Sequence, residues 1–371
     1  MSILRFWEGV PAPGIHPFVR LVMGNESADL DSMLSALLHA FCLSRSSPVP
    51  VVPVFLLPRH EIQLRKDALF IFDRFRVPID KVWCVEELAS VSPDSFDLVL
   101  VDHNRMAESV KHLESRVVEI VDHHVDEGLF SPITGTKRNI CYGVGSCVTL
   151  VAEQLAEECK HVLEDPVVCS MILSTIVIDT NGLDSSKKVF SERDVNQIRR
   201  VEAFCPEDIR FGGDIQKLYQ FIVELRTDVF QFSSEEILKR DCKSGRENGV
   251  SFTIAAVSVS LQSLLAHRAD FCKAVEDWAQ DFDLGCVMTA FNGEDESFHR
   301  QILLHSRSDA LLLRFVDEIR KLDFKTKEFG FEPLLLPEFS PHPKFLLFSQ
   351  TNTKASRKQV MPAIAAIASN L

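Results

Sequence analysis

Four short segments of the sequence place acidic residues, and in two cases histidines, directly after apolar runs. They are residues 24–32 (GNESADLDS), 101–104 (VDHN), 121–124 (VDHH) and 178–180 (IDT). Carboxylates gathered at one point repel each other and resist ionisation unless cations lie among them. Oxygen ligands joined by one imidazole suit Mg²⁺ or Mn²⁺ better than a structural zinc site. If the fold brings the four segments together, the sequence predicts a divalent metal site.

Each segment also has a purely structural interpretation. A single Asp after a strand commonly caps a helix or a turn. Asp29 and Asp31 could simply begin a helix near Ser32, where negative charge interacts favourably with the helix dipole. His123 and His124 could be a surface pair. Four coordinated occurrences in one chain make metal binding the better interpretation.

The elements around these segments alternate between strand-like and helix-like patterns, and a parallel sheet covered by helices is typical of that alternation. Ligands of such sheets bind outside the carboxyl ends of the strands, so residues far apart in the sequence can meet there. The run 167–179 fits either a helix or a strand. We expect strands at 18–24, 50–55, 81–84, 98–102 and 117–122, and helices at 32–44, 61–75 and 144–158.

The second half of the chain has a different pattern. From about residue 193 to 225 it is helical and charged, with a break at Gly212 and Gly213 that suits an inter-domain connection. The runs beyond this connection indicate an α+β domain with a mixed or antiparallel sheet: 235–239, 250–259, 284–291, 310–322 and 345–347. We therefore expect a first domain at 1–200, a linker at 201–215 and a second domain at 216–371.

Composition excludes several classes of protein. The chain of 371 residues has 40 Lys+Arg against 53 Asp+Glu, a net charge of −13. This balance argues against a nucleic-acid or membrane partner, and an anionic substrate must be met by local cations or metal. Ten scattered cysteines without a Cys-x-x-Cys pair indicate reduced thiols in an intracellular protein. We expect a cytoplasmic protein.

The four segments, in this order and at this spacing, resemble the motifs of the DHH phosphoesterases. Residues 144–149 (VGSCVT) are similar to the helix-opening segment of that family. Residues 240–243 (RDCK) and 356–359 (SRKQ) resemble motifs of the companion domain in family II inorganic pyrophosphatases, eukaryotic exopolyphosphatases and prune-like proteins. The resemblance implies an α/β fold: an N-terminal parallel-sheet DHH domain and a smaller α+β C-terminal domain, with the active site in the cleft between them.

The resemblance also implies a hydrolase with two divalent metal ions, Mg²⁺ or Mn²⁺. Asp29 and Asp31 would each hold one ion, and Asp102 and Asp179 would bridge or share them. His123 would complete one coordination shell. Two such ions can activate water for displacement at phosphorus.

The remaining roles implied by the resemblance concern the substrate. His124 would contact the substrate phosphate as a donor or acid, with Asp122 supporting the histidine pair. Lys243, Arg357 and Lys358 would bind phosphate oxygens from the second domain, since a planar Arg and a mobile Lys suit that task. Taken alone, Arg357 and Lys358 are more typical of a solvated surface pair.

Asn25 is the one departure from the pyrophosphatase pattern, which has His at this position. The Gly-Asn-Glu form resembles eukaryotic exopolyphosphatases and prune-like proteins. Asn25 could offer its amide oxygen to a metal ion, leave that place to water, or only cap the turn. We therefore expect an exopolyphosphatase acting on linear inorganic polyphosphate. The alternatives are an inorganic pyrophosphatase acting on pyrophosphate and a prune-like nucleotide phosphodiesterase or regulatory protein.

Overall fold

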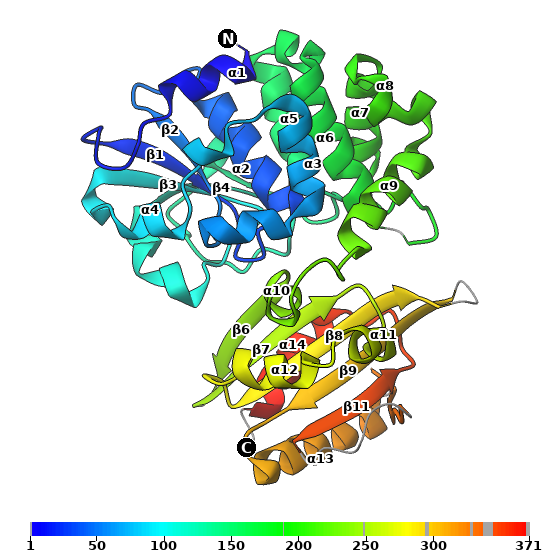
Figure 1. Cartoon of the computed structure of the whole chain (residues 1–371). Coiled ribbons are helices and arrows are strands. Elements are labelled where there is room, and N and C mark those ends of the chain that lie inside the picture. The colour runs from blue at the N-terminus through cyan, green and yellow to red at the C-terminus, as the bar shows by residue number, and fades with distance from the viewer. Residues whose placement is uncertain are drawn as a thin grey trace. The chain divides into compact units, whose positions relative to one another are not determined.

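The structure, a computed structural model, describes residues 2–187, 189–247, 249–293, 297–326, 329–336 and 344–368. The chain divides into two compact units, Met1–Arg226 and Thr227–Leu371 (Figure 1). All ten cysteines are free thiols. Among the described residues, no helix combines the length and the apolar character needed to cross a membrane.

The first unit is built on a sheet of five parallel strands in the order β2-β1-β3-β4-β5. Strands β1, β3 and β4 are almost wholly apolar and buried, as expected when both faces of a sheet are covered. The chain reverses its direction of travel across the sheet between β1 and β3, the position where ligands of such folds bind. The strands are β1 Val19–Met23, β2 Val51–Val54, β3 Phe96–Val101, β4 Val117–Asp122 and β5 Arg138–Ile140.

Helices pack against this sheet (Figure 1), which confirms the predicted architecture. Helix α2 contacts β1, β2 and β3 and packs against α5 and α6. One expectation differs from the structure: 81–84 forms only a bridge between Trp83 and Val54. The run 167–179, which fitted either a helix or a strand, is a helix. The helices are α1 Ile3–Phe6, α2 Leu30–Leu43, α3 Lys66–Phe75, α4 Val85–Ala89, α5 Cys147–Glu158, α6 Pro166–Asp179, α7 Glu192–Val201, α8 Glu207–Arg210 and α9 Ile215–Thr227.

The segment 201–215, which we expected to be a linker, lies inside the first unit. Val201 and Ile209 are buried in its core, as are Leu218 and Ile222 of α9. The division between the units falls after Arg226. The boundary seen in the structure therefore lies beyond the expected linker.

The second unit contains a six-stranded sheet in the order β10-β11-β9-β8-β7-β6. Only the β7–β8 pair is parallel in the described part of this sheet, so the expected mixed sheet is confirmed. The strands are β6 Cys242–Glu247, β7 Val250–Val257, β8 Leu284–Asn292, β9 Phe298–His305, β10 Phe331–Pro333 and β11 Phe345–Gln350. The helices are α10 Ser234–Lys239, α11 Leu261–His267, α12 Phe271–Trp278, α13 Asp309–Thr326 and α14 Arg357–Ala368.

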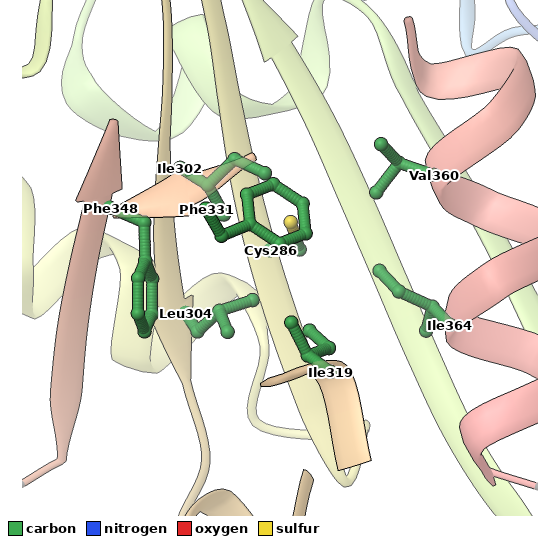
Figure 2. A pocket seen from close by; sticks show the side chains of 8 residues that line it. All are labelled: Cys286, Ile302, Leu304, Ile319, Phe331, Phe348, Val360 and Ile364. Carbon is green, nitrogen blue, oxygen red and sulfur yellow. The ribbon is translucent and has the colours of Figure 1, made fainter. Parts of the chain in front are cut away.

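The core of the second unit contains a small apolar pocket (Figure 2). Side chains from four strands and from α13 and α14 line it, and burial raises the pKa of the one thiol among them, Cys286, to about 12. An apolar lining without a charged group offers nothing to a phosphate or a metal ion. The pocket is therefore a feature of the core. Its lining residues are Cys286, Ile302, Leu304, Ile319, Phe331, Phe348, Val360 and Ile364.

Candidate active site

The loop after β1 is shaped by its own side chains. The backbone N–H of Asn25 donates to Ser32 Oγ at 2.7 Å, and Asn25 Oδ1 accepts from the Ser27 N–H at 2.8 Å. Asp29 caps α2 by accepting from the Ser32 N–H at 3.1 Å. A Cβ at Gly24 would lie 2.2 Å from Ser32 Oγ, so only glycine fits there. Asp29 thus has its structural role as a helix cap, and its side chain is also exposed at the carboxyl edge of the sheet.

Asp31, in the first turn of α2, is buried and receives four hydrogen bonds. Its Oδ1 accepts from the hydroxyls of Ser35 and Ser146, both at 3.1 Å, and from the Val148 N–H at 2.9 Å. Its Oδ2 accepts from the Cys147 N–H at 2.7 Å. The helix-opening segment 144–149 therefore fixes the orientation of Asp31 through the first N–H groups of α5.

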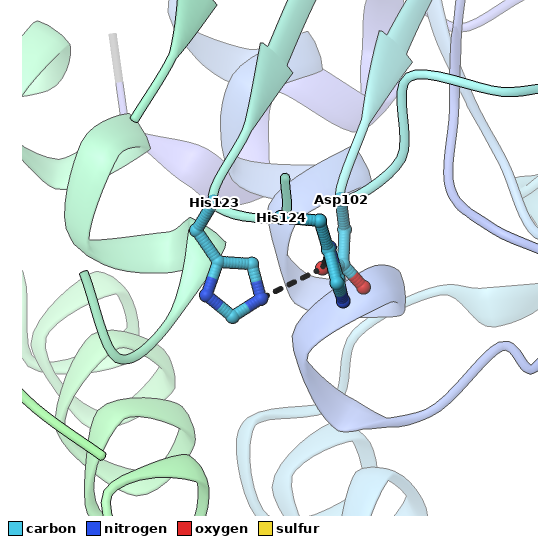
Figure 3. Close-up of side chains that lie close together, drawn as sticks. All are labelled: Asp102, His123 and His124. Atoms are coloured by element: carbon cyan, nitrogen blue, oxygen red, sulfur yellow. Dashed lines mark ion pairs between the residues drawn. The ribbon is translucent and has the colours of Figure 1, made fainter. Parts of the chain in front are cut away.

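Asp102 ends β3 in a left-handed backbone conformation, with φ of 62°, and is almost fully buried. Its Oδ2 accepts from Asn25 Nδ2 at 2.7 Å. Its Oδ1 lies 3.3 Å from His123 Nε2 and 3.7 Å from His124 Nδ1 (Figure 3). Burial, and then the nearby charge of Asp31, raise the pKa of Asp102 to about 7, although His123 lowers it. The surroundings of Asp102 thus disfavour its ionised form, which a nearby cation would stabilise.

His123 presents one ring nitrogen to the carboxylates. Its Nδ1 donates to the Val144 carbonyl at 3.0 Å, which leaves Nε2 facing Asp102 Oδ1 and, at 3.6 Å, Asp31 Oδ2. Burial lowers the pKa of His123, but Asp102 and Asp31 outweigh it and raise the pKa to about 10. Nε2 is therefore the ring nitrogen of His123 that is available to a metal ion.

Asp122 and His124 form a separate pair. Asp122 is buried, and its Oδ1 accepts from both the backbone N–H and Nδ1 of His124, at 3.1 and 2.8 Å. Asn104 Nδ2 donates to its Oδ2 at 2.5 Å. Burial raises the pKa of Asp122, but the bonds from His124 and Asn104 outweigh it and hold the pKa below its usual value. The His124 side chain is 37% exposed, so its Nε2 can meet a substrate.

Asp179 is the last residue of α6, so the run that fitted either a helix or a strand is a helix. Within the described residues, its buried Oδ2 accepts no hydrogen bond. Burial, followed by the charges of Asp31 and Asp29, raises its pKa well above the usual value, and Arg226 opposes this rise. Asp179 is thus a carboxylate close to two others and lacking a donor on one oxygen.

These observations fit divalent metal ions. Asp102, His123 and His124 each offer a ligand atom, and the three atoms lie within 4.8 Å of one another. The raised pKa values of Asp102 and Asp179 have the common cause that carboxylates are buried together. Cations among them would remove that penalty, and Asp29 and Asp31 supply further oxygen ligands.

A second group of possible ligands, Cys84, Glu86 and Glu87, has a structural explanation. Glu87 accepts from the Cys84 N–H at 2.7 Å as part of the capping box of α4. It also forms an ion pair with Arg59 at 2.8 Å. These contacts explain why the acidic side chains gather there without a metal ion.

The structure brings the two motifs of the second unit together. Arg357 opens α14 and donates to the Asp241 carbonyl at 2.8 Å and to Asp241 Oδ1 at 2.6 Å. Lys243 follows two residues later on β6, which contacts α14. Arg357 is therefore held in place next to the strand that carries Lys243.

The Ser-Arg-Lys-Gln segment is also a helix start. The N–H and hydroxyl of Ser356 both donate to Gln359 Oε1 at 2.8 Å, so the Gln359 side chain makes one half of a capping box. This explains two of its four residues by local structure. Lys358 is exposed at the beginning of the helix.

The comparisons with known proteins agree with this geometry. Residues 220–367 match the DHHA2 domain, and residues 20–178 match the N-terminal domain of the DHH family. The chain therefore belongs to the DHH family, as its motifs predicted. The DHH match spans the five-stranded parallel sheet of the first unit, and the DHHA2 match spans the mixed sheet of the second.

Relatives of the chain include phosphate-hydrolysing enzymes. Human exopolyphosphatase PRUNE1 is 28% identical over 357 residues, covering 93% of this chain and 75% of that protein. A probable manganese-dependent inorganic pyrophosphatase of Bacillus anthracis is 24% identical over 257 residues, covering 69% and 76%. The crystal structure of a putative family II inorganic pyrophosphatase from Methanococcus jannaschii has the same fold, with a TM-score of 0.60 and 21% identity over 95% of this chain and all of that one. Together these findings support a metal-dependent phosphoesterase.

Asn25 provides a test of how the site is organised, because both atoms of its amide group already have partners in Ser27 and Asp102. A histidine cannot make both contacts, so Asn25→His is expected to lower the free energy of unfolding by about 1–2 kcal/mol. We expect the Mg²⁺ and Mn²⁺ activation curves of the variant to differ from those of the wild type by the same shift for both metals. A selective rise in Mn²⁺-supported activity would show instead that residue 25 is a metal ligand.

Proposed function

We propose that the chain is an exopolyphosphatase that releases terminal phosphate from linear inorganic polyphosphate. The proposal depends on one observation, the gathering of Asp102, His123 and Asp179 beside Asp31. The raised pKa values of Asp102 and Asp179 indicate that nearby cations would stabilise both carboxylates. The exopolyphosphatase relative and the Gly-Asn-Glu form of the first motif support the choice of polyphosphate. The choice of polyphosphate as substrate and the cytoplasmic location are both predictions.

In this proposal, Asp29, Asp31, Asp102, Asp179 and His123 hold two divalent cations, Mg²⁺ or Mn²⁺. Bound there, the cations supply positive charge that lowers the pKa of an attacking water and offsets the charge on the phosphoryl oxygens. The protein keeps the carboxylates in position before the metal arrives, through Asn25 on Asp102 and the start of α5 on Asp31.

His124 would act on the leaving group. Asp122 accepts a hydrogen bond from the Nδ1–H of His124. The doubly protonated ring can then donate its Nε2 proton to the bridging oxygen as the P–O bond breaks. The attacking water forms the new P–O bond and loses its proton. The shortened polyphosphate and orthophosphate then leave the site.

Lys243, Arg357 and Lys358 are proposed to bind phosphate oxygens of the chain substrate. Of these, Lys358 is the exposed cation, whereas Arg357 is also bonded to Asp241. Several phosphates in a row need several cations, which agrees with a substrate longer than pyrophosphate.

Lys358→Gln is expected to raise KM and lower kcat together, so that kcat/KM falls about tenfold, since a charge that binds the transition state contributes to both. Steady-state kinetics on polyphosphate would measure this. Lys354→Gln is the matched control, because Lys354 is an exposed lysine of the preceding turn. An unchanged kcat/KM in the Lys358 variant would place this residue outside the substrate site.

Two other functions remain as alternatives: an inorganic pyrophosphatase and a prune-like nucleotide phosphodiesterase or regulatory protein. A steady-state assay with polyphosphates of several lengths, pyrophosphate and a cyclic nucleotide separates them. We expect the highest kcat/KM with polyphosphate and orthophosphate as the released product. Preference for pyrophosphate or for the nucleotide would replace the proposed substrate, and inactivity on all of them would favour a regulatory protein.

A further inference from the structure

Arg65 is a buried arginine that none of the motifs contains, yet it bonds directly to the loop of the first motif. It caps α3, and its side chain is among the buried polar groups of the first unit, with 7% exposure. Its Nε donates to the Ala28 carbonyl and its Nη2 to the Ser27 carbonyl, both at 2.8 Å. The guanidinium therefore donates hydrogen bonds to two successive backbone carbonyls between Asn25 and Asp29.

The third nitrogen of the guanidinium, Nη1, indicates that Arg65 is buried mainly to bind the loop. Nη1 is buried and has no hydrogen-bond partner within the described residues. Burying an arginine is costly unless its donors are satisfied. Here the two loop carbonyls supply the hydrogen bonds that offset this cost, so the loop and the guanidinium hold each other in place.

The loop needs such support because its backbone is strained. Ala28 has φ of 43°, in the left-handed region that residues with a Cβ avoid for steric reasons. This turn separates Asn25, which donates to Asp102, from Asp29, which caps α2. A relaxed turn would move these two side chains relative to each other.

The same start of α3 also supports the other side of the site. Asp67, two residues after Arg65, is buried and forms an ion pair with Arg226. Burial lowers the pKa of Arg226, but the charge of Asp67, followed by those of Asp179 and Asp29, outweighs burial and raises the pKa. The segment from Arg65 to Asp67 is thus linked to the proposed metal ligands indirectly, through the loop carbonyls and through Arg226.

We propose that Arg65 is a positioning residue of the metal site. Its two hydrogen bonds to the carbonyls of Ser27 and Ala28 set the relative positions of Asn25 and Asp29. These positions in turn determine the affinity for divalent metal. This inference rests on the metal site of the proposed function. It does not depend on which phosphate compound is the substrate.

Arginine is needed for these two hydrogen bonds because its planar fork holds two donors at a fixed spacing, whereas lysine presents a single mobile ammonium. Arg59 is a matched control in the same part of the chain. Its Nη1 and Nη2 donate to the carbonyls of Ile79 and Val82, at 3.2 and 2.7 Å, and neither belongs to the site. Arg59→Lys therefore removes a comparable pair of hydrogen bonds to the backbone elsewhere.

The test measures Mn²⁺ binding to the full chain by isothermal titration calorimetry, with the melting temperature of the metal-free protein recorded for each variant. For Arg65→Lys we expect the Kd for Mn²⁺ to weaken about 10- to 100-fold, the range typical when a group that orients metal ligands is lost. For Arg59→Lys we expect a similar loss of melting temperature and an unchanged Kd.

A folded Arg65→Lys variant with the wild-type Kd would overturn the inference. If that variant does not fold, Arg65→Gln, which keeps one amide donor, replaces it. Failure of both variants to fold while Arg59→Lys folds would show that Arg65 serves the fold and not the metal site, which also overturns it. Absence of Mn²⁺ binding by the wild type is a different result, since it would remove the metal site itself.

Discussion

Asp102→Ala is expected to lower the rate of phosphate release by about 10³-fold or more, because the shared carboxylate contributes to the charge of both metal positions. The fold should persist. Asp102 is buried at a cost to its ionised form, as its pKa of about 7 shows, so the folded protein gains little from this charge in the absence of metal. The measurement is turnover at saturating Mg²⁺, with the circular dichroism spectrum and melting temperature as checks of folding.

Asp179→Ala should have the same effect from the opposite side of the site. Asp97→Ala is a suitable control, because Asp97 lies near the start of the same strand as Asp102 and pairs at the surface with Arg20 and Arg116. That variant should keep nearly full activity. Retention of more than a few per cent of the wild-type rate by either Asp102→Ala or Asp179→Ala would contradict the two-metal assignment.

His124→Gln is expected to lower kcat by about 10²- to 10⁴-fold, the usual contribution of a general acid. Glutamine has no proton to transfer at neutral pH, although its amide can still donate a hydrogen bond to Asp122. Because the proposed metal ligands are untouched, Mn²⁺ affinity should change little. Single-turnover kinetics together with calorimetry measure the two effects separately.

Asp122→Asn provides the companion variant, since it preserves the shape of the carboxylate but removes the negative charge that faces His124 Nδ1. It should lower kcat less than His124→Gln does. If His124→Gln instead retained kcat within about twofold of the wild type, the donor role of His124 would be untenable.

The sequence predicted the arrangement of the first sheet because its strands are short apolar runs, each followed by acid. Parallel strands share one carboxyl edge, so the residues after β1, β3 and β4 had to meet there. The run before Asp179 could not be assigned, because α6 is buried on nearly all sides and shows no helical periodicity. The acid at its end still reaches the site, since either element can end at that edge.

The boundary between the units was harder to predict because a glycine pair looked like a break in the chain. In the structure Gly212 and Gly213 have φ of 68° and 85° and form a turn within the first unit. The helix after this turn packs on the core through Leu218 and Ile222. A turn between packed helices and a turn in a linker have the same local sequence, and only distant contacts distinguish them.

Arg65 shows the other limit of sequence analysis. An arginine inside the expected helix 61–75 is typical of a solvated helix face, and nothing in its neighbourhood marks it as buried. Its partners, Ser27 and Ala28, offer backbone carbonyls, which every residue has. The contact depends on how α3 packs beside the first motif, and that packing is a property of the tertiary structure.

The central claim is that the carboxyl edge of the first sheet holds two divalent cations. Crystals soaked with Mn²⁺ test it directly, because the anomalous scattering of manganese locates each ion. We predict two anomalous peaks, both in contact with Asp102 or Asp179 and one of them also in contact with His123. No peak at these carboxylates, with or without a peak at Cys84, Glu86 and Glu87, would contradict the account.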